Sequence, residues 1–353
     1  MNVTGIVTEV RAALDEGALR AYLEPRLQGI GEIKVRQFEG GQSNPTYLLE
    51  SGDRRWVLRK KPAGQLLPSA HMVEREYQVI AALQGSGVPV PGVPVFCEDA
   101  SVIGTPFFVM DYVHGRVVAD PALREGFTPD DRRAAYRSAI STLAKLHRFD
   151  WAKGGLASFG KPDAYVERQL ARWSKQYAAS KSREMAAMDF LLEWLPRNIG
   201  VVTSTAPASG IVHGDFRLGN MILAPTSPDV IALLDWELST IGDPLTDLAY
   251  FVYPYHVPAG DTGLRGIAGL DLAAMGIPAA DELVAQYAEE RGITAPTPEQ
   301  MRFYVAFGLF RLAAILVGIE ARASQGNASS ENAKEVAAQA GTFAEVARRV
   351  VEG

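Results

Sequence analysis

The spacing of hydrophobic positions differs between the first third of the chain and the rest. Between residues 33 and 62, apolar and polar side chains alternate, as at Trp56 and Leu58. Alternation of this kind indicates half-buried strands. A glycine-rich stretch separates two such runs, and a later run at 105–115 is almost continuously apolar. We therefore predict a small β-rich lobe over residues 1–113.

One helix interrupts this β-rich part, and it carries a carboxylate on its apolar side. Glu76 falls inside the apolar stripe, so it should point inward, where a carboxylate without a partner is costly. The preceding strand offers Arg59 and Lys60, which face opposite sides. We favour Arg59 as the partner and keep Lys60 as the alternative. The stripe of the predicted helix consists of Met72, Val73, Tyr77, Ile80 and Leu83.

After Pro129 the apolar positions follow helical spacing, so we predict a larger and mostly helical lobe over residues 114–353. The most apolar run covers residues 303–319. Arg311 lies near its middle, which would cost about 2.5–3.5 kcal/mol in a membrane. The run is also shorter than the roughly 20 residues that a membrane span needs. We expect a buried helix there and no membrane insertion.

Composition excludes several classes of protein. The chain has 353 residues, 47% of them hydrophobic, and a formal charge of -6. This charge argues against a dedicated nucleic-acid partner, which would show a basic face. A single cysteine, Cys97, excludes an intramolecular disulfide and is typical of a reducing compartment. The first residues lack the pattern of a secretory signal, so we expect a cytoplasmic protein.

Two short predicted strands, at 210–216 and 230–237, end in polar residues. Asp215 and Asn220 follow the first strand, and Asp235 lies at the end of the second. Three oxygen-bearing side chains at the ends of two neighbouring strands suit Mg²⁺. The alternative is that these residues only shape turns and cap the next element.

The order and spacing of these residues match the catalytic loop of protein kinases. There an Asp base is followed by a metal-binding Asn and later by a metal-binding Asp. Arg217, two positions after Asp215, could reach a transferring phosphoryl group. The stretch "FEGGQSNPTY" lies where a kinase keeps its nucleotide-covering loop, and Ser43 and Asn44 could donate to phosphate. Gly40 and Gly41 alone are typical of any hairpin turn.

The stretch "IVHGDFRLGNMIL", followed by "VIALLDWELSTIGDPLTDLAYF", resembles the aminoglycoside phosphotransferase and choline kinase superfamily. The segments "VEREYQVIAAL", "VPVPGVPVF" and "LAKLH" extend the resemblance over essentially the whole chain. It implies an α+β, bilobal protein-kinase-like fold with a nucleotide-binding first lobe. It also implies ATP and Mg²⁺ as cofactors and phosphorylation of a small-molecule hydroxyl.

The resemblance assigns roles to individual residues. Asp215 matches the catalytic base, and Asn220 and Asp235 match the metal ligands. His213 matches a residue that braces the loop, and Asp247 matches an acidic residue that stabilises it from below.

The resemblance also assigns nucleotide contacts. Met110, Asp111 and Tyr112 match the hinge that meets adenine through backbone groups. Glu76 with a cation of the preceding strand matches the pair that holds the phosphates. If that cation is Arg59, it replaces the family's usual Lys, and Lys60 stays the alternative.

The stretch "WVLRKKPAGQLLPSAHMVEREY" is similar to a narrower subgroup, the kinase-like domain fused ahead of acyl-CoA dehydrogenase domains in larger proteins. This points to a hydroxyacyl-CoA acceptor. Arg168, Arg172 and Lys175 recur at helical spacing and form a basic face that could attract such an anion. The alternative is a solvated surface. Glu237 is a further candidate for contact with the substrate.

Other functions stay open at this point. An aminoglycoside or choline-type kinase is the first alternative. A non-catalytic nucleotide-binding regulator and a metal-dependent phosphohydrolase are two others.

Overall fold

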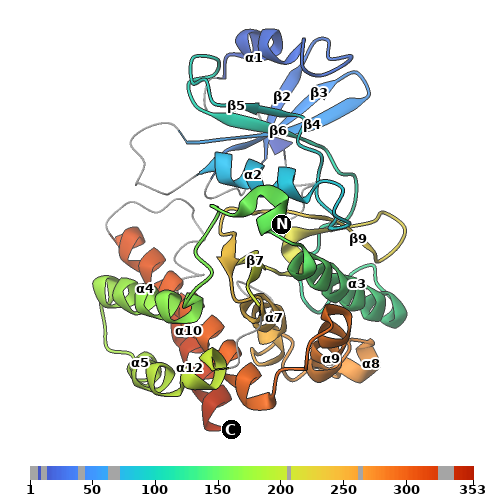
Figure 1. Cartoon of the computed structure of the whole chain (residues 1–353). Coiled ribbons are helices and arrows are strands. Elements are labelled where there is room, and N and C mark those ends of the chain that lie inside the picture. Colours follow the sequence, from blue (N-terminus) through green and yellow to red (C-terminus); the bar gives the residue numbers. More distant parts are fainter. Residues whose placement is uncertain are drawn as a thin grey trace. The chain divides into compact units, whose positions relative to one another are not determined.

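The computed structural model describes residues 7–8, 14–38, 44–62, 72–204, 208–260, 265–324 and 338–353 (Figure 1). The chain divides into two compact units. The domain boundary near residue 113 stays a prediction, because unit 1 also includes two later segments. Unit 1 comprises Met1–Ala119, Trp151–Phe159 and Leu218–Ser239, and unit 2 comprises Asp120–Asp150, Gly160–Arg217 and Thr240–Gly353.

Unit 1 contains a six-stranded sheet in which every pair of neighbouring strands is antiparallel. The strands predicted between residues 33 and 62 and at 105–115 are confirmed. The sequence reading missed the short strand β1 and the helix α1 (Glu16–Leu23). In spatial order the strands are β1 (Val7–Thr8), β2 (Lys34–Phe38), β3 (Thr46–Ser51), β4 (Arg54–Lys60), β6 (Phe107–Asp111) and β5 (Val95–Cys97).

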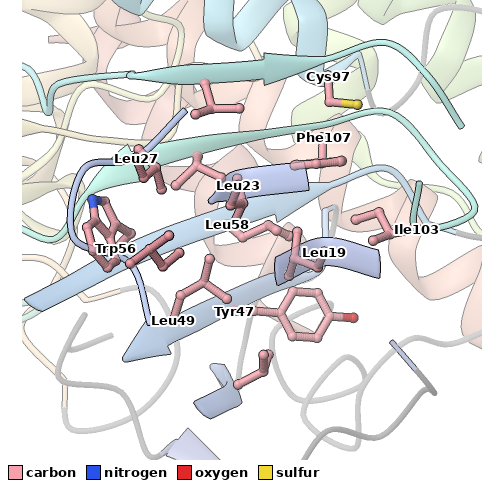
Figure 2. Close-up of a cluster of buried hydrophobic side chains, with 14 residues drawn as sticks. Leu19, Leu23, Leu27, Tyr47, Leu49, Trp56, Leu58, Cys97, Ile103 and Phe107 are labelled. Atoms are coloured by element: carbon pink, nitrogen blue, oxygen red, sulfur yellow. The ribbon is translucent and has the colours of Figure 1, made fainter. Parts of the chain in front are cut away.

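The two faces of this sheet carry different helices. Leu19 and Leu23 of α1 pack on one face, against Leu58 of β4 (Figure 2). The helix α2 (Val73–Leu83) covers the opposite face, where its Tyr77 stacks on Phe96 of β5 with ring centroids 4.6 Å apart. Successive side chains of a strand point to opposite faces. The neighbours Leu58 and Arg59 therefore point to α1 and to α2, respectively.

Unit 1 also contains a hairpin that is flanked by two predicted site residues, Asn220 before its first strand and Asp235 after its second. It consists of β8 (Met221–Leu223) and β9 (Val230–Leu233), which pair antiparallel. Arg116 exchanges both backbone hydrogen bonds with Leu223, at 2.8 Å each. A π-helical turn, Ala152–Leu156, packs against α2 in the same unit.

Unit 2 is mostly helical, as predicted. Its only described strands are β7 (Gly210–Val212) and β10 (Thr240–Gly242), which pair with each other. The expectation that the strands at 210–216 and 230–237 are neighbours is therefore wrong, because β7 pairs with β10 and β9 pairs with β8. The helices are α3 (Pro129–Arg148), α4 (Tyr165–Ser180), α5 (Ala186–Asn198), α6 (Gly200–Thr203), α7 (Leu245–Val252), α8 (Leu272–Met275), α9 (Ala280–Arg291), α10 (Pro298–Ser324) and α12 (Ala340–Glu352).

The apolar run at 303–319 lies in α10, which packs against α4, α5, α7 and α12 (Figure 1). By length and composition this helix could cross a membrane, but 72% of its most apolar 18-residue window is buried inside the protein. The prediction of a buried helix at the core of the larger part is confirmed.

The packing of α1 on the sheet generates a stability prediction. Leu58 is fully buried in the cluster of Figure 2. Leu58→Ala should lower the free energy of unfolding by about 2–5 kcal/mol, because a cavity replaces the lost contacts. Arg55→Ala, at an exposed position of the same strand, should cost less than about 1 kcal/mol. Denaturant titration measures both, and equal losses would contradict this account of the core.

Candidate active site

The guanidinium of Arg59 is the centre of a charged cluster in unit 1. Its Nε lies 3.2 Å from Oε2 of Glu76, and its Nη2 lies 2.9 Å from Oδ1 of Asp235. The same Nη2 is 3.6 Å from Oε2 of Glu237. The prediction that Glu76 meets a strand cation is confirmed, and the cation is Arg59. Glu237, expected near the substrate, belongs to this cluster.

Burial and unequal charge set the electrostatics of this cluster. Glu76 is 1% exposed, and burial raises its pKa to about 7. Arg59 opposes this shift, while Asp235 and Glu237 reinforce it. Burial alone would lower the pKa of Arg59, but the three carboxylates raise it, so the guanidinium stays charged. Asp235 and Glu237 alone outnumber the single guanidinium, and this excess of carboxylates suits a further cation.

Lys60 lies on the other face of β4. Its Nζ is 5.9 Å from the ring centroid of Tyr47, and the residue is 7% exposed. Burial lowers the pKa of this ammonium group. The alternative pairing of Lys60 with Glu76 is therefore wrong, because strand geometry directs adjacent side chains to opposite faces.

Asn44 orients Glu76 in this structure. It is 1% exposed, and its Nδ2 donates to Oε1 of Glu76 at 2.6 Å. The expectation that Asn44 donates to phosphate stays a prediction, because the bond to Glu76 uses only one of the two N–H donors of this amide. Ser43, Gly40 and Gly41 lie outside the described residues.

Asn220 and Asp235 come together through the backbone of unit 1. The N–H of Leu234 donates to the carbonyl of Asn220 at 2.8 Å, which brings Asn220 next to the residue that precedes Asp235. Asp235 has a φ of +66°, in the left-handed region that few residues other than glycine adopt. Such strained positions are common at functional sites.

The donor set fits a magnesium ion with an incomplete protein shell. Among the described residues, no three His, Cys, Asp or Glu side chains gather as a metal site. Asp235 and Asn220 nevertheless offer a carboxylate and an amide oxygen. Mg²⁺ usually takes one or two protein ligands and completes its shell with phosphates and water.

Arg75 is a residue of this cluster's surroundings that the sequence reading missed. It precedes Glu76 on α2, and its Nη2 donates to the carbonyl of Phe159 at 2.7 Å and of Ser239 at 3.3 Å. The guanidinium also lies 4.0 Å from the ring centroid of Phe159. Arg75 therefore ties α2 to two distant segments of unit 1.

The second set of predicted residues lies in unit 2, around Asp247. This buried carboxylate accepts the backbone N–H of His213 at 2.6 Å and that of Gly214 at 2.9 Å. The N–H of Asp215 donates to Nδ1 of His213 at 3.2 Å. Gly214 has a φ of +85°, which glycine adopts without strain. His213 and Asp247 thus fix the backbone on which Asp215 stands.

A second layer supports Asp247. Nε2 of His147 lies 3.4 Å from its Oδ2, and Nδ1 of His147 lies 2.7 Å from the hydroxyl of Tyr287. Burial alone would raise the pKa of Asp247, but the hydrogen bonds from His147 and the loop backbone lower it, so this group stays ionised. The sequence reading placed His147 on a helical stripe without assigning it a partner.

Arg217 lies beside Asp215, as its position two residues later suggested. Its Nε is 3.2 Å from Oδ2 of Asp215, and its side chain is 37% exposed. Burial opposes the charge of Arg217, but the carboxylate of Asp215 outweighs burial and raises the pKa of the guanidinium.

The predicted hinge lies at the end of β6. Met110 is buried, Asp111 is exposed and Tyr112 is half-buried. The N–H of Asp111 donates to the carbonyl of Gly92 at 2.8 Å, so this donor already has a partner within unit 1. The expected backbone contacts of residues 110–112 with adenine stay a prediction.

The predicted basic face lies on α4 in unit 2. Arg168, Arg172 and Lys175 are exposed on this helix. Arg168 donates to the carbonyl of Lys161 at 2.5 Å, and the guanidinium of Arg172 is 5.3 Å from the ring centroid of Trp173. The opposite, buried face consists of Tyr165, Val166, Leu170, Trp173 and Tyr177.

Known proteins are similar to this chain over most of its length. A sequence profile described as the phosphotransferase enzyme family matches residues 34–304. The Mus musculus protein named acyl-CoA dehydrogenase family member 10 is 43% identical over 337 residues. The match covers 95% of this chain and 31% of that protein, so the chain spans about a third of the relative's length.

Solved structures confirm the α+β, kinase-like fold. A Ralstonia eutropha JMP134 protein, provisionally named an aminoglycoside phosphotransferase, is 40% identical with a TM-score of 0.86. The match covers 96% of this chain and 99% of that one. The GDP complex of aminoglycoside 2'-phosphotransferase-IIIa is similar in fold alone, at 16% identity and a TM-score of 0.62 over 93% and 99% of the two chains.

The raised pKa of Glu76 predicts a pH-dependent stability. Glu76 ionises near 4.5 in the unfolded chain and near 7 in the folded protein. Between these two pH values the folded state binds more protons than the unfolded state. Protonation of Glu76 therefore stabilises the folded state at low pH, and this contribution is lost as the pH rises through about 7. Residue 76 of Glu76→Gln cannot ionise, so the stability of this variant relative to the wild type should rise between about pH 4.5 and about pH 7.

Urea unfolding at several pH values measures this difference. Arg59→Gln serves as the second arm, because removing the guanidinium should move the loss of stability to higher pH. A difference between Glu76→Gln and the wild type that does not change with pH would contradict the assignment.

Proposed function

Because the chain belongs to the phosphotransferase enzyme family, we propose that it transfers the γ-phosphoryl group of Mg·ATP to a hydroxyl of a small molecule. One observation carries this proposal. The guanidinium of Arg59 contacts both the buried Glu76 and Asp235 in unit 1. A phosphotransferase needs a cation for the phosphates and a carboxylate for the metal, and both are present in this one cluster.

Each residue of the cluster has a proposed role toward the nucleotide. Arg59 holds the phosphates in place of the usual Lys, and Glu76 fixes its orientation. Asp235 and Asn220 hold Mg²⁺, which neutralises charge that develops on the phosphate oxygens. The surplus of carboxylates around Arg59 favours such an ion. The backbone of Met110 and Tyr112 receives the adenine.

In unit 2, Asp215 acts as the general base. It orients the acceptor hydroxyl and takes its proton as the oxygen forms a bond to the γ-phosphorus. The bond from that phosphorus to the β,γ-bridging oxygen breaks, and ADP leaves with the electron pair. Arg217, 3.2 Å from Asp215, offers positive charge to the transferring group. His213 and Asp247 hold the loop.

The acceptor that we propose is a hydroxyacyl thioester of coenzyme A. Two observations support an anionic acceptor over a polycationic aminoglycoside. Arg168, Arg172 and Lys175 form an exposed basic face on α4. The name of the relative acyl-CoA dehydrogenase family member 10 refers to an acyl-CoA thioester, although that name describes a much longer protein.

The base assignment generates a kinetic prediction. Asp215→Asn should keep the fold and the affinity for Mg·ATP and lower kcat by about 10²–10⁴, the usual contribution of a general base. Steady-state kinetics and calorimetric titration with ATP measure the two effects. Asp281→Asn, at an exposed position of α9, should leave both unchanged. Wild-type turnover by the Asp215 variant would sink the assignment.

The acceptor assignment is tested by comparing substrates under identical Mg·ATP conditions. The set contains a hydroxyacyl-CoA, the free hydroxy acid, choline and an aminoglycoside. We expect turnover of the thioester. Turnover of an aminoglycoside alone would support the first alternative, and ATP binding with no turnover would support a regulator.

Charge reversal on α4 then tests the basic face. Arg168→Glu and Arg172→Glu should each raise KM for the thioester by about threefold to fivefold, because an exposed charge contact is worth up to about 1 kcal/mol. The KM for ATP should not change. Arg137→Glu, at an exposed position of α3, is the matched control. Equal effects at all three positions would show only general charge repulsion.

A further inference from the structure

Arg311 is a charged residue in the middle of α10, the long apolar helix of unit 2. Its helical neighbours Phe310, Leu312 and Ala313 are buried. Arg311 itself is half-buried, so its guanidinium loses part of its hydration, and an apolar residue of similar volume would often be at least as stabilising. Helix packing alone therefore gives no reason for an arginine here.

The contacts of Arg311 lead to the loop of Asp215. Its Nη2 donates a hydrogen bond to the carbonyl oxygen of Gly214. The guanidinium carbon lies 5.8 Å from the ring centroid of Trp173 on α4 and 5.6 Å from that of Tyr250 on α7. These distances lie within the range of cation–π attraction. Two aromatic rings and one carbonyl thus hold the charge.

The bond to Gly214 completes the restraint of one residue of the loop. The N–H of Gly214 donates to Oδ1 of Asp247 at 2.9 Å, and its carbonyl accepts from Arg311. The φ of Gly214 is +85°, a conformation that a free glycine leaves readily. The two bonds therefore restrain backbone rotation at the residue immediately before Asp215.

A third observation places Arg311 and Asp215 in one electrostatic environment. Burial and the charge of Asp215 raise the pKa of Tyr250, while Arg311 and Arg217 oppose the shift. Tyr250 therefore faces the carboxylate of the loop and both cations. The guanidinium of Arg311 thus lies in the same charged surroundings as the loop that carries Asp215.

We propose that Arg311 is a positioning residue that fixes the Gly214–Asp215 peptide and so aims the Asp215 carboxylate. It also links α4 to the loop through Trp173, so the helix with the basic face and the base share one support. The role of Asp215 as a base rests on the proposed phosphotransferase function. The restraint of the Gly214–Asp215 peptide by Arg311 does not depend on that function and can be measured separately.

Hydrogen exchange of the intact protein tests the restraint without any substrate. Arg311→Met keeps the length and apolar character of the helix, so the fold should survive. Backbone amides of residues 211–217 should exchange about tenfold faster, as expected from losing one charge-assisted hydrogen bond. Amides in α9 and in the sheet of unit 1 should not change. Arg322→Met, at an exposed position of the same helix, is the matched control.

Kinetics test whether the restraint matters for turnover. ADP release from Mg·ATP, with the active acceptor or with water as acceptor, should fall in kcat by about tenfold to hundredfold in Arg311→Met, because the base is misplaced. The KM for Mg·ATP should stay near the wild-type value. In Arg311→Ala, added methylguanidinium should restore kcat, whereas ammonium at the same ionic strength should not.

The outcomes separate the two ideas. Unchanged loop exchange in Arg311→Met overturns the positioning role. Faster loop exchange with unchanged kcat also overturns it, because the restraint then does not aim the base. If the wild type releases no ADP under any condition, the phosphotransferase proposal fails, and loop exchange alone decides the restraint. If Arg311→Met does not fold, rescue of Arg311→Ala by methylguanidinium decides instead, and absence of rescue overturns the proposal.

Discussion

The sharing of one guanidinium among three carboxylates is the interaction on which unit 1 depends. Arg59 holds the buried Glu76 of α2 and, at the same time, Asp235 at the end of β9. A carboxylate as buried as Glu76 would be costly without this partner. Arg59 of the sheet therefore links α2 and the β8–β9 hairpin, because Glu76 and Asp235 both contact its guanidinium.

Much of this arrangement could be predicted from apolar spacing. Alternation identified the strands around Trp56 and Leu58, and the helical stripe placed Glu76 inward, where it is 1% exposed. Strand geometry then left only two cations as partners. The pairing of short strands could not be predicted, because three-residue elements such as β7 and β8 carry no register information in their side chains.

The contacts of Arg75 and Arg311 could not be predicted from the sequence, for one physical reason. Arg75 and Arg311 donate to backbone carbonyls, of Phe159 and Gly214 respectively. Every residue has a carbonyl, so such a partner leaves no trace in the sequence, unlike a carboxylate in an apolar stripe. The role of Asp247 came only from family resemblance for the same reason, since it binds two backbone N–H groups.

The opposite orientation of adjacent side chains in β4 makes the length of this strand as important as its composition. Insertion or deletion of one residue between the β3–β4 turn and Arg59 would exchange the two faces. The guanidinium would then enter the aliphatic layer under α1, and a hydrocarbon side chain would meet Glu76. Insertions and deletions in unit 1 should therefore be confined to loops, because the number of residues in β4 determines which face of the sheet the Arg59 guanidinium occupies.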